Sequence, residues 1–259
     1  MPTLSVHPDE EAVAAAAAER LTSLIEEAIR TRGSALVCLT GGATPQRLYE
    51  LLADERRPWR GRVDWTAVHL FWGDERHVPP DHPDSNFGMA ARALVSQVPV
   101  PPGQVHRMRG ECRDAVDAAR DYEAALRTGF RAAGRTDLIF DVMLLGLGTD
   151  AHIASLFPGS APLSAAGGES GAPTPRVVAV WADHLKAWRI TLTPAAILDA
   201  RTLVMLVSGE EKAAAAEAAF ECPLDVSRSP VQLLRAAGAR VEWIMDAAAA
   251  ARLRGGRLS

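Results

Sequence analysis

The sequence contains few cysteines, no strong excess of one charge and no long apolar run. Its three cysteines, Cys38, Cys112 and Cys222, lie far apart and form no C-x-x-C pair, so we expect reduced structural thiols rather than a disulfide framework. The net charge of −4 comes without a block of lysine or arginine, so nothing draws the chain electrostatically to nucleic acid. No apolar run approaches the roughly 18 residues that cross a bilayer. We expect a globular cytoplasmic protein with neither a nucleic-acid nor a membrane partner.

Metal-ligand spacing is also missing from the sequence. His77, Asp81 and His82 are close together, but three prolines hold their loop extended and no recognisable ligand pattern appears. We therefore expect no metal site.

The chain does contain enough apolar residues, 48% of the total, to form a buried core. Short segments rich in Val, Leu and Ile alternate with alanine-rich helical stretches, which is typical of strand and crossover-helix units. We predict an α/β fold, in which one domain over residues 1–259 has a mostly parallel, Rossmann-like sheet flanked by helices on both faces. The predicted strands are Ala35–Leu39, Ala67–Trp72, Ile139–Leu145, Val177–Trp181, Trp188–Leu192, Leu203–Val207 and Val241–Ile244. The predicted helices lie near residues 9–31, 45–53, 86–96, 113–133, 194–199, 210–219, 230–236 and 246–253.

Three predicted helices begin with a hydroxyl residue followed by proline: Thr44-Pro45, Thr193-Pro194 and Ser229-Pro230. A hydroxyl can cap the helix, and proline is preset for the first helical position. The segment Pro158–Pro175 is rich in Gly, Pro, Ser and Ala and has no periodicity. We predict a long loop there rather than a linker between domains, because apolar strands of the same kind are predicted on both sides of it.

Two predicted strands lead into polar loops that could bind an anion. The first strand ends in Gly41 and Gly42 before the helix at Thr44-Pro45, and free backbone N–H groups at such a turn can hold a phosphate or carboxylate. A plain tight turn would also need glycine. The second loop, residues 73–86, carries Arg76 at the carboxyl end of a strand, where ligands of open α/β sheets bind. A solvated loop with a local salt bridge is the alternative.

A third loop follows the strand that ends at Leu145 and resembles a dinucleotide-binding fingerprint in its glycine spacing. That fingerprint needs a long helix after its glycines, whereas Pro158 comes only seven residues after Ala151. A carboxylate at Asp150 would also repel a pyrophosphate. The loop instead presents Asp150 and His152, in which a carboxylate can orient an imidazole that titrates near neutrality. A purely structural histidine is the alternative.

Four motifs follow one another along the chain. They are Gly41-Gly42-Ala43-Thr44-Pro45, Gly73-Asp74-Glu75-Arg76, Ser85-Asn86-Phe87-Gly88-Met89 and the segment Gly146–Pro158, which contains Asp150-x-His152-x-Ala154-Ser155-Leu156-Phe157. With these motifs, and with Lys186, Arg189-Ile190-Thr191-Leu192-Thr193 and Lys212 further on, the chain resembles the 6-phosphogluconolactonase family over nearly its full length. The segment around His152 is the most specific of the motifs. Gly-Gly-x-Thr-Pro is shared with a wider superfamily of sugar-phosphate isomerases and deaminases.

The resemblance implies hydrolysis of 6-phospho-D-glucono-1,5-lactone to 6-phospho-D-gluconate in the oxidative pentose phosphate pathway, without a metal or organic cofactor. It makes His152 the general base on water, with Asp74 and Asp150 holding the geometry. Arg76 would neutralise charge on the lactone oxygen or the phosphate. The residues that it implies for substrate and phosphate binding are Gly41, Gly42, Ala43, Thr44, Asn86, Lys186 and Arg189. The expected partner is a small phosphorylated sugar lactone, bound by a monomer or a small homo-oligomer.

Two alternatives share part of this pattern. Glucosamine-6-phosphate deaminases look similar through the same glycines, but they have a glutamate shortly after the histidine, where this chain continues Ser155-Leu156-Phe157-Pro158. A sugar-phosphate sensor without turnover is the second alternative. It stays open because Ala151 stands where the family usually has glycine. If residue 151 has a positive φ, alanine there would strain the loop that aims His152.

Overall fold

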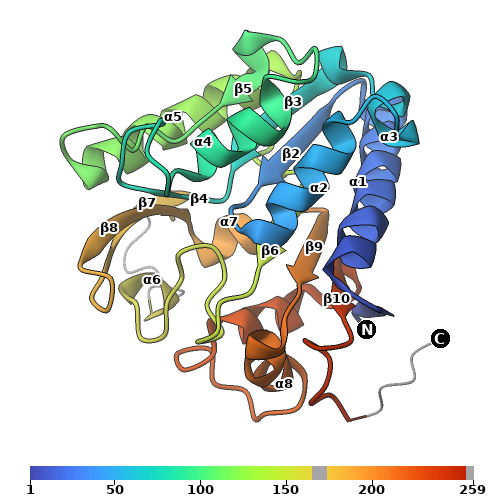
Figure 1. Ribbon diagram of the computed structural model, residues 1–259. Helices are drawn as coiled ribbons and strands as arrows, with labels where there is room; N and C mark the ends of the chain where they lie inside the picture. The colour runs from blue at the N-terminus through green and yellow to red at the C-terminus, as the bar shows by residue number, and fades with distance from the viewer. Residues whose placement is uncertain (165–173, 255–259) are drawn as a thin grey trace.

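The computed structural model describes residues 1–164 and 174–254, and its centre is a parallel sheet (Figure 1). Strands rich in Val, Leu and Ile form it, as expected for a sheet that is covered on both faces. Within the described residues its strands follow the order β1 (Thr3–His7), β10 (Val241–Asp246), β9 (Thr202–Val207), β6 (Val142–Gly146), β2 (Ala35–Leu39), β3 (Val68–Trp72) and β5 (Val105–His106). Every neighbouring pair is parallel.

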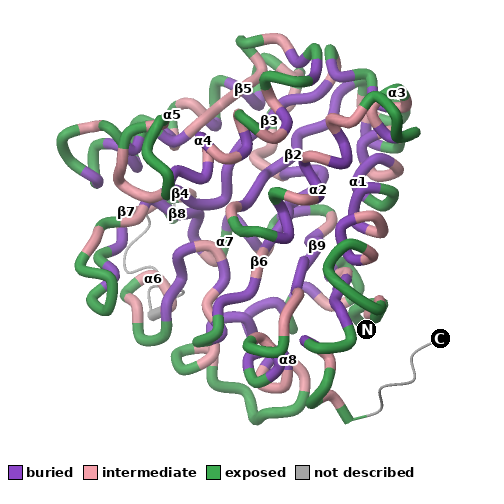
Figure 2. Tube along the Cα trace, viewed as in Figure 1, coloured by how far each residue is buried: buried purple, intermediate pink, exposed green. Residues whose placement is uncertain are grey.

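Helices cover both faces of this sheet, because successive side chains of each strand point to opposite sides. In β2, Leu36 and Cys38 belong to one buried cluster, whereas Val37 and Leu39 belong to another. The first cluster is covered by α5 (Ala115–Ala132), α7 (Pro194–Leu198), α8 (Ala213–Phe220) and the 3₁₀ segment η5 (Pro230–Arg240). The second is covered by α1 (Glu10–Arg32), α2 (Ala43–Ala53), α3 (Pro58–Arg62) and α4 (Asn86–Ala90). Figure 2 shows buried strands between helices whose outer sides are exposed.

A second, antiparallel sheet lies beside the first and consists of β4 (Asp74–Arg76), β8 (Ala187–Leu192) and β7 (Val177–Ala182). The strands predicted near 177–181 and 188–192 are therefore present, but they form a hairpin rather than part of the parallel sheet. Only residues 183–186 connect them, and parallel pairing needs a crossover of a dozen or more residues. The predicted fold class, a mostly parallel sheet with helices on both faces, is confirmed.

All of the predicted strands exist, and the elements that were missed include β1, α3, β4 and β5. The predicted helix over 246–253 is wrong, because β10 continues to Asp246 and residues 247–252 form turns. Asp246 closes the first of these turns by accepting a hydrogen bond from the Ala249 N–H at 2.7 Å. A run of alanines favours a helix, but the tertiary pairing of β10 with β1 fixes the chain in another conformation.

Several predicted helices are shorter or tighter than expected. The 86–96 helix is α4 followed by a π-helical turn, η2 (Ala91–Val95), and the 210–219 helix begins with the 3₁₀ turn η4 (Glu210–Lys212). Short 3₁₀ turns also precede β3, at η1 (Trp65–Ala67), and β5, at η3 (Pro102–Gln104). Within the predicted loop 158–175, residues Ala161–Ser164 form the helical turn α6. Residues 165–173 lie outside the described residues, so the order of that loop stays a prediction.

No helix in the described ranges is long and apolar enough to cross a membrane.

Candidate active site

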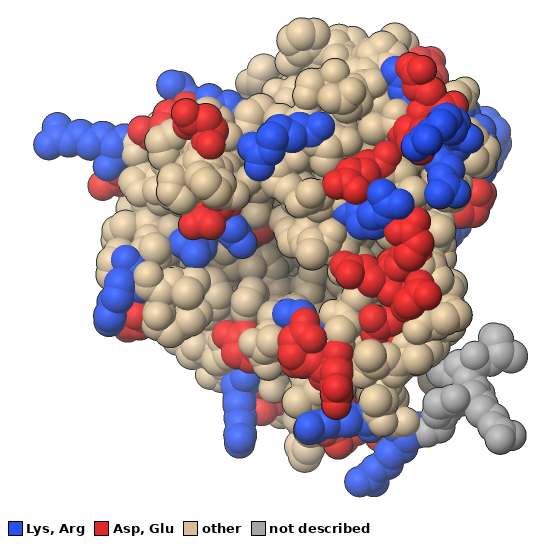
Figure 3. Space-filling model, in the orientation of Figure 1, with Lys and Arg blue, Asp and Glu red and all other residues tan. Residues whose placement is uncertain are grey.

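A cleft of about 330 Å³ opens at the carboxyl ends of the central strands, where β2 and β6 diverge. These two strands pair only at Val37↔Val142 and Cys38↔Met143, although β6 continues to Gly146. The chain continues from β2 to β3 on one side and from β6 towards β9 on the other, so the cleft lies at a topological switch point, the usual ligand site of open α/β sheets. Figure 3 shows this face hollowed near its middle, with basic side chains at the edge of the hollow. The residues that line the cleft are Thr40, Gly41, Gly42, Asp74, Arg76, Asn86, Gly146, Leu147, Gly148, His152, Ala154, Ser155, Phe157, His184, Leu185, Arg189 and Lys212.

His152 and Asp150 form a hydrogen-bonded pair after β6. The Asp150 Oδ1 lies 2.5 Å from the His152 Nδ1 and 3.2 Å from the His152 backbone N–H. Partial burial acts to raise the pKa of Asp150, but the hydrogen bond and the charge of His152 lower it to about 2. The carboxylate therefore stays ionised near neutral pH and holds the proton of the imidazole on Nδ1. Within the described residues Nε2 forms no hydrogen bond, so the nitrogen left to act on a ligand is Nε2.

Gly148 explains the glycine spacing that resembled a dinucleotide fingerprint. A Cβ atom on Gly148 would lie 2.0 Å from His152 Nδ1 and 2.7 Å from Asp150 Oδ1. The Gly148 N–H also donates to the His152 carbonyl at 2.9 Å. Glycine at this position therefore makes room for the imidazole and its carboxylate, and turns rather than a long helix follow β6.

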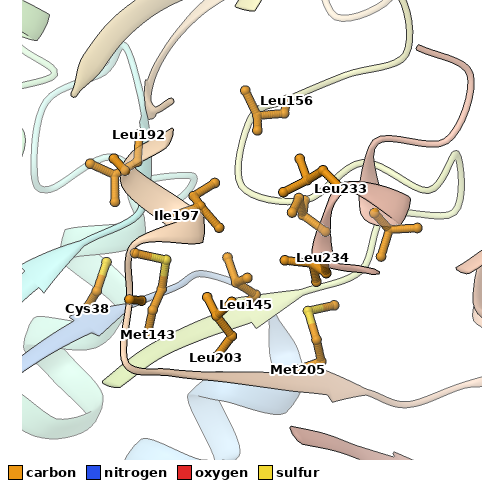
Figure 4. Packing of buried hydrophobic residues seen from close by; sticks show 14 of the residues in the cluster. Cys38, Met143, Leu145, Leu156, Leu192, Ile197, Leu203, Met205, Leu233 and Leu234 are labelled. Atoms are coloured by element: carbon orange, nitrogen blue, oxygen red, sulfur yellow. The ribbon is translucent and has the colours of Figure 1, made fainter. Parts of the chain in front are cut away.

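The loop that carries His152 is fixed from below by buried apolar residues. Ile153 and Leu156 are fully buried, and Figure 4 shows Leu156 in the same cluster as Leu192 of β8 and Leu233 of η5. The Ala151 carbonyl accepts a hydrogen bond from the Val231 N–H at 2.9 Å. Side chains from β8 and η5 thus hold the loop from two sides.

Ala151 has a left-handed backbone conformation, with φ +66°, and this positive φ is the condition under which alanine was expected to strain the loop. Ala154 in the same loop also has a positive φ, +49°. An alanine in this region stores strain of about 1–2 kcal/mol relative to glycine. The loop therefore keeps the shape that suits glycine and bears the cost of the methyl group.

The substitution Ala151→Gly measures this strain when it is compared with Ala28→Gly in α1. Both residues are buried, so both changes remove a buried methyl group and add similar freedom to the unfolded chain. Because only Ala151 is strained, we expect Ala151→Gly to retain about 1–2 kcal/mol more unfolding free energy than Ala28→Gly. Denaturant unfolding of the two variants measures the difference. Equal losses would mean that residue 151 stores no strain.

Arg76 and Arg189 lie next to each other as a register pair of β4 and β8. Arg76 Nη1 donates to the Asp84 carbonyl at 2.6 Å, and Arg189 Nη1 donates to the Trp188 carbonyl at 3.0 Å. Burial lowers the pKa of Arg189, and the positive charge of Arg76 lowers it further. Among the described residues neither guanidinium forms a salt bridge, so this corner of the cleft attracts an anion or a developing negative charge.

Asp74 is buried and anchors the loops around these arginines. Its Oδ2 accepts a hydrogen bond from the Ser155 hydroxyl at 2.6 Å, and its Oδ1 accepts one from Asn86 Nδ2 at 3.2 Å. Asp74 thus joins the His152 loop, through Ser155, to the start of α4, through Asn86. The neighbouring Glu75 accepts hydrogen bonds from the backbone N–H groups of residues 76, 86 and 87 and from the Ser85 hydroxyl.

The turn before α2 presents backbone N–H groups to the cleft. Gly42 is the N-cap residue, with φ +114°, and no side chain caps the helix. The N–H groups of the first turn are therefore open to an anion. Thr44 does not cap the helix, because α2 begins one residue earlier, at Ala43; its hydroxyl instead donates to Glu10 Oε1 at 3.1 Å. The side chains of Ala43 and Thr44 are not among those lining the cleft.

Seven of the eleven expected site residues line the cleft, and Ala43, Thr44, Asp150 and Lys186 do not. Lys186 does not line the cleft: its ammonium pairs with Asp183 Oδ1 at 3.1 Å, and its side chain is 76% exposed. Lys212, at the end of η4, lines the cleft instead. Its place after the strand predicted over 203–207 is the signal that could have identified it.

Two ring-bearing residues of the cleft, Phe157 and His184, were not predicted as site residues, although Phe157 belongs to the motif around His152. Phe157 packs between His152 and His184, with ring centroids 4.7 Å and 4.9 Å away. His184 lies in the β7–β8 connection, which could be placed beside His152 only once the hairpin was known. In the described parts of the chain, no group of three or more His, Cys, Asp or Glu residues could hold a metal ion.

Comparisons with known proteins agree with this geometry. The sequence model of the family described as glucosamine-6-phosphate isomerases/6-phosphogluconolactonase matches residues 8–243. A 6-phosphogluconolactonase of Nostoc is 34% identical over 257 residues, 97% of this chain and 98% of its own length. One of Mycobacterium tuberculosis is 38% identical over 265 residues, with 97% and 98% covered. The solved 6-phosphogluconolactonase of Trypanosoma brucei is 29% identical, covers 98% of this chain with 99% of its own, and superposes with a TM-score of 0.80. The chain therefore belongs to the glucosamine-6-phosphate isomerase and 6-phosphogluconolactonase family.

Proposed function

We propose that this protein hydrolyses 6-phospho-D-glucono-1,5-lactone to 6-phospho-D-gluconate in the oxidative pentose phosphate pathway. Relatives named for this activity match the chain over almost its full length. The observation that carries the proposal is His152, which is hydrogen-bonded to Asp150 and lies in one cleft with two arginines that have no carboxylate partner among the described residues. Together these groups supply a base and a positive charge for attack of water on a carbonyl.

The base in this proposal is His152. Its Nε2 removes a proton from a water molecule as the water oxygen adds to C1 of the lactone. The ionised Asp150 stabilises the imidazolium that forms, because it already accepts a hydrogen bond from Nδ1. The bond between C1 and the ring oxygen then breaks, and His152 returns the proton to that oxygen. The products are the carboxylic acid at C1, which ionises, and a free hydroxyl.

Arg76 and Arg189 are the groups that we assign to the carbonyl oxygen. The oxygen gains negative charge as water adds, and a guanidinium pair in a partly buried cleft stabilises that charge more strongly than water does. Asp74 positions this corner through its bonds to Asn86 and Ser155. In this assignment Asp74 and Asn86 hold geometry and do not exchange protons with the substrate.

The 6-phosphate in this proposal binds at the start of α2. The uncapped N–H groups after Gly42 and the positive end of the helix dipole favour a dianion. Lys212 adds a full positive charge at the same cleft. In this proposal the lactone carbonyl and the phosphate contact different groups, so phosphate binding and hydrolysis depend on different residues.

We further propose that residues 1–259 act as one domain, as a monomer or small homo-oligomer in the cytoplasm. All of β1 pairs with β10, from Thr3↔Glu242 to His7↔Asp246, so segments near the two ends of the chain share one sheet. Cys38, Cys112 and Cys222 are free thiols, which suits a reducing compartment.

The test is product formation from freshly made 6-phosphogluconolactone, corrected for spontaneous hydrolysis. Glucosamine 6-phosphate is assayed in parallel for release of ammonia. We expect enzyme-dependent hydrolysis of the lactone and no ammonia. Ammonia release without lactone hydrolysis would assign a deaminase, and binding without either reaction would assign a sensor.

A further inference from the structure

The chain has two tyrosines, Tyr49 and Tyr122, and both are fully buried, on opposite faces of the parallel sheet. The Tyr49 hydroxyl accepts a hydrogen bond from the Thr40 N–H at 3.0 Å and donates one to the Thr40 carbonyl at 2.9 Å. The Tyr122 hydroxyl does the same for Trp72, at 2.8 Å and 2.9 Å. Each hydroxyl thus holds both polar groups of one backbone residue.

Thr40 and Trp72, whose backbone groups bind the tyrosine hydroxyls, each lie where a strand stops pairing with one neighbouring strand. Thr40 directly follows β2, whose pairing with β6 ends at Cys38. Trp72 is the last residue of β3, whose pairing with β5 ends at Phe71. In the described structure the β2–β6 and β3–β5 pairings do not extend to Thr40 or Trp72, and a buried N–H or C=O without a partner is unfavourable.

Thr40 and Trp72 also come shortly before residues that line the cleft. Thr40 precedes Gly41 and Gly42, and Trp72 lies two residues before Asp74; these three later residues line the cleft. Tyr49 lies in α2, so its hydroxyl ties that helix back to the strand that leads into the same turn. From these contacts we infer that Tyr49 and Tyr122 are positioning residues, which set the backbone of the anion-binding turn and of the Asp74–Arg76 segment.

Each tyrosine hydroxyl can donate to the backbone carbonyl only while the phenol keeps its proton. Burial raises the pKa of Tyr49 and that of Tyr122 above the ordinary value, so each hydroxyl can donate to a carbonyl throughout the neutral range. A phenylalanine fills the same volume but leaves both backbone groups without partners. The expected result is a shifted strand end rather than a cavity.

The inference rests on the proposed function, and it predicts different kinetic changes for the two tyrosines. In Tyr49→Phe, we expect KM for 6-phosphogluconolactone to rise about tenfold with kcat changed less than about threefold, because the phosphate turn moves. In Tyr122→Phe, we expect kcat to fall about tenfold, because Asp74 and Arg76 move relative to the carbonyl. Ile25→Ala, a buried change in α1, is the control: it lowers Tm without altering KM or kcat. Phe variants that lose only Tm, as this control does, would overturn the inference.

A second measurement does not depend on the folding of either variant. The wild-type chain grown with 3-fluorotyrosine contains two fluorine labels, one at each strand end. We expect 6-phosphogluconate to shift both ¹⁹F resonances and inorganic phosphate to shift mainly that of Tyr49. Binding of 6-phosphogluconate, measured by calorimetry, with neither resonance moved would overturn the inference. Failure of the proposed function is distinguishable, since the unlabelled wild type would then lack lactonase activity.

Discussion

Replacing His152 with glutamine is expected to lower kcat for hydrolysis of 6-phosphogluconolactone by about 10²–10⁴-fold, the usual contribution of a general base. Glutamine retains a polar side chain of similar length but cannot accept the proton of a water molecule. The phosphate site is built from other residues, so binding of 6-phosphogluconate should persist. Stopped-time assays of product, corrected for spontaneous hydrolysis, and calorimetric titration of 6-phosphogluconate measure the two effects.

His77→Gln is the matched control for this substitution. The His77 Nε2 donates a hydrogen bond to the Cys112 carbonyl at 2.6 Å, and His77 does not line the cleft. We therefore expect kcat of His77→Gln to lie within about twofold of wild type. If His152→Gln kept more than about a third of wild-type kcat, the base would be another group, because a general base contributes at least about 10²-fold. His184 would then be the remaining imidazole in the cleft.

The second large effect concerns the phosphate. We expect kcat/KM for unphosphorylated D-glucono-1,5-lactone to be lower than that for the 6-phosphate by about 10³-fold or more, because binding energy from the remote phosphate aligns the reacting carbonyl. Parallel assays of the two lactones, each corrected for its own spontaneous rate, give the ratio. Similar values of kcat/KM would remove the phosphate site from the account.

Lys212→Met locates that site. A charge-assisted hydrogen bond to phosphate is worth about 1.5–3 kcal/mol, so KM for the phosphorylated lactone should rise by about 10–100-fold. The rate with the unphosphorylated lactone should not change. Lys186→Met is the control, because Lys186 is exposed and paired with Asp183, and it should leave both substrates unaffected. The opposite pattern would restore the assignment that the sequence alone suggested.

Much of the fold could be predicted because its signals are local. Strands such as β2 and β9 are short apolar runs, and Thr193 before Pro194 does cap α7 by accepting a hydrogen bond from the Ala196 N–H. Strand β1 could not be found in this way, because only Leu4 and His7 of its five residues are partly buried. Its stability comes from pairing with β10, more than 200 residues away in the chain.

The site shows the same division between local and long-range signals. Asp150 and His152 are two residues apart, so their hydrogen bond could be inferred from the sequence. Which lysine lines the cleft depends instead on the tertiary structure. The Lys186 ammonium pairs with Asp183 in the connection between β7 and β8, whereas Lys212 lines the cleft from η4. Ala151 combines both kinds of signal, since the expected strain required a positive φ and the structure has one.

The most direct measurement of the central claim is a crystal structure of the protein with 6-phosphogluconate bound. We predict that the C1 carboxylate lies within hydrogen-bond distance of His152 Nε2 and of Arg76 or Arg189, and that the phosphate contacts the N–H groups at the start of α2 and the Lys212 ammonium. The reverse orientation, with the phosphate on the two arginines and C1 far from His152, would contradict the assignment of the base. Binding of the product outside the cleft would contradict the site itself.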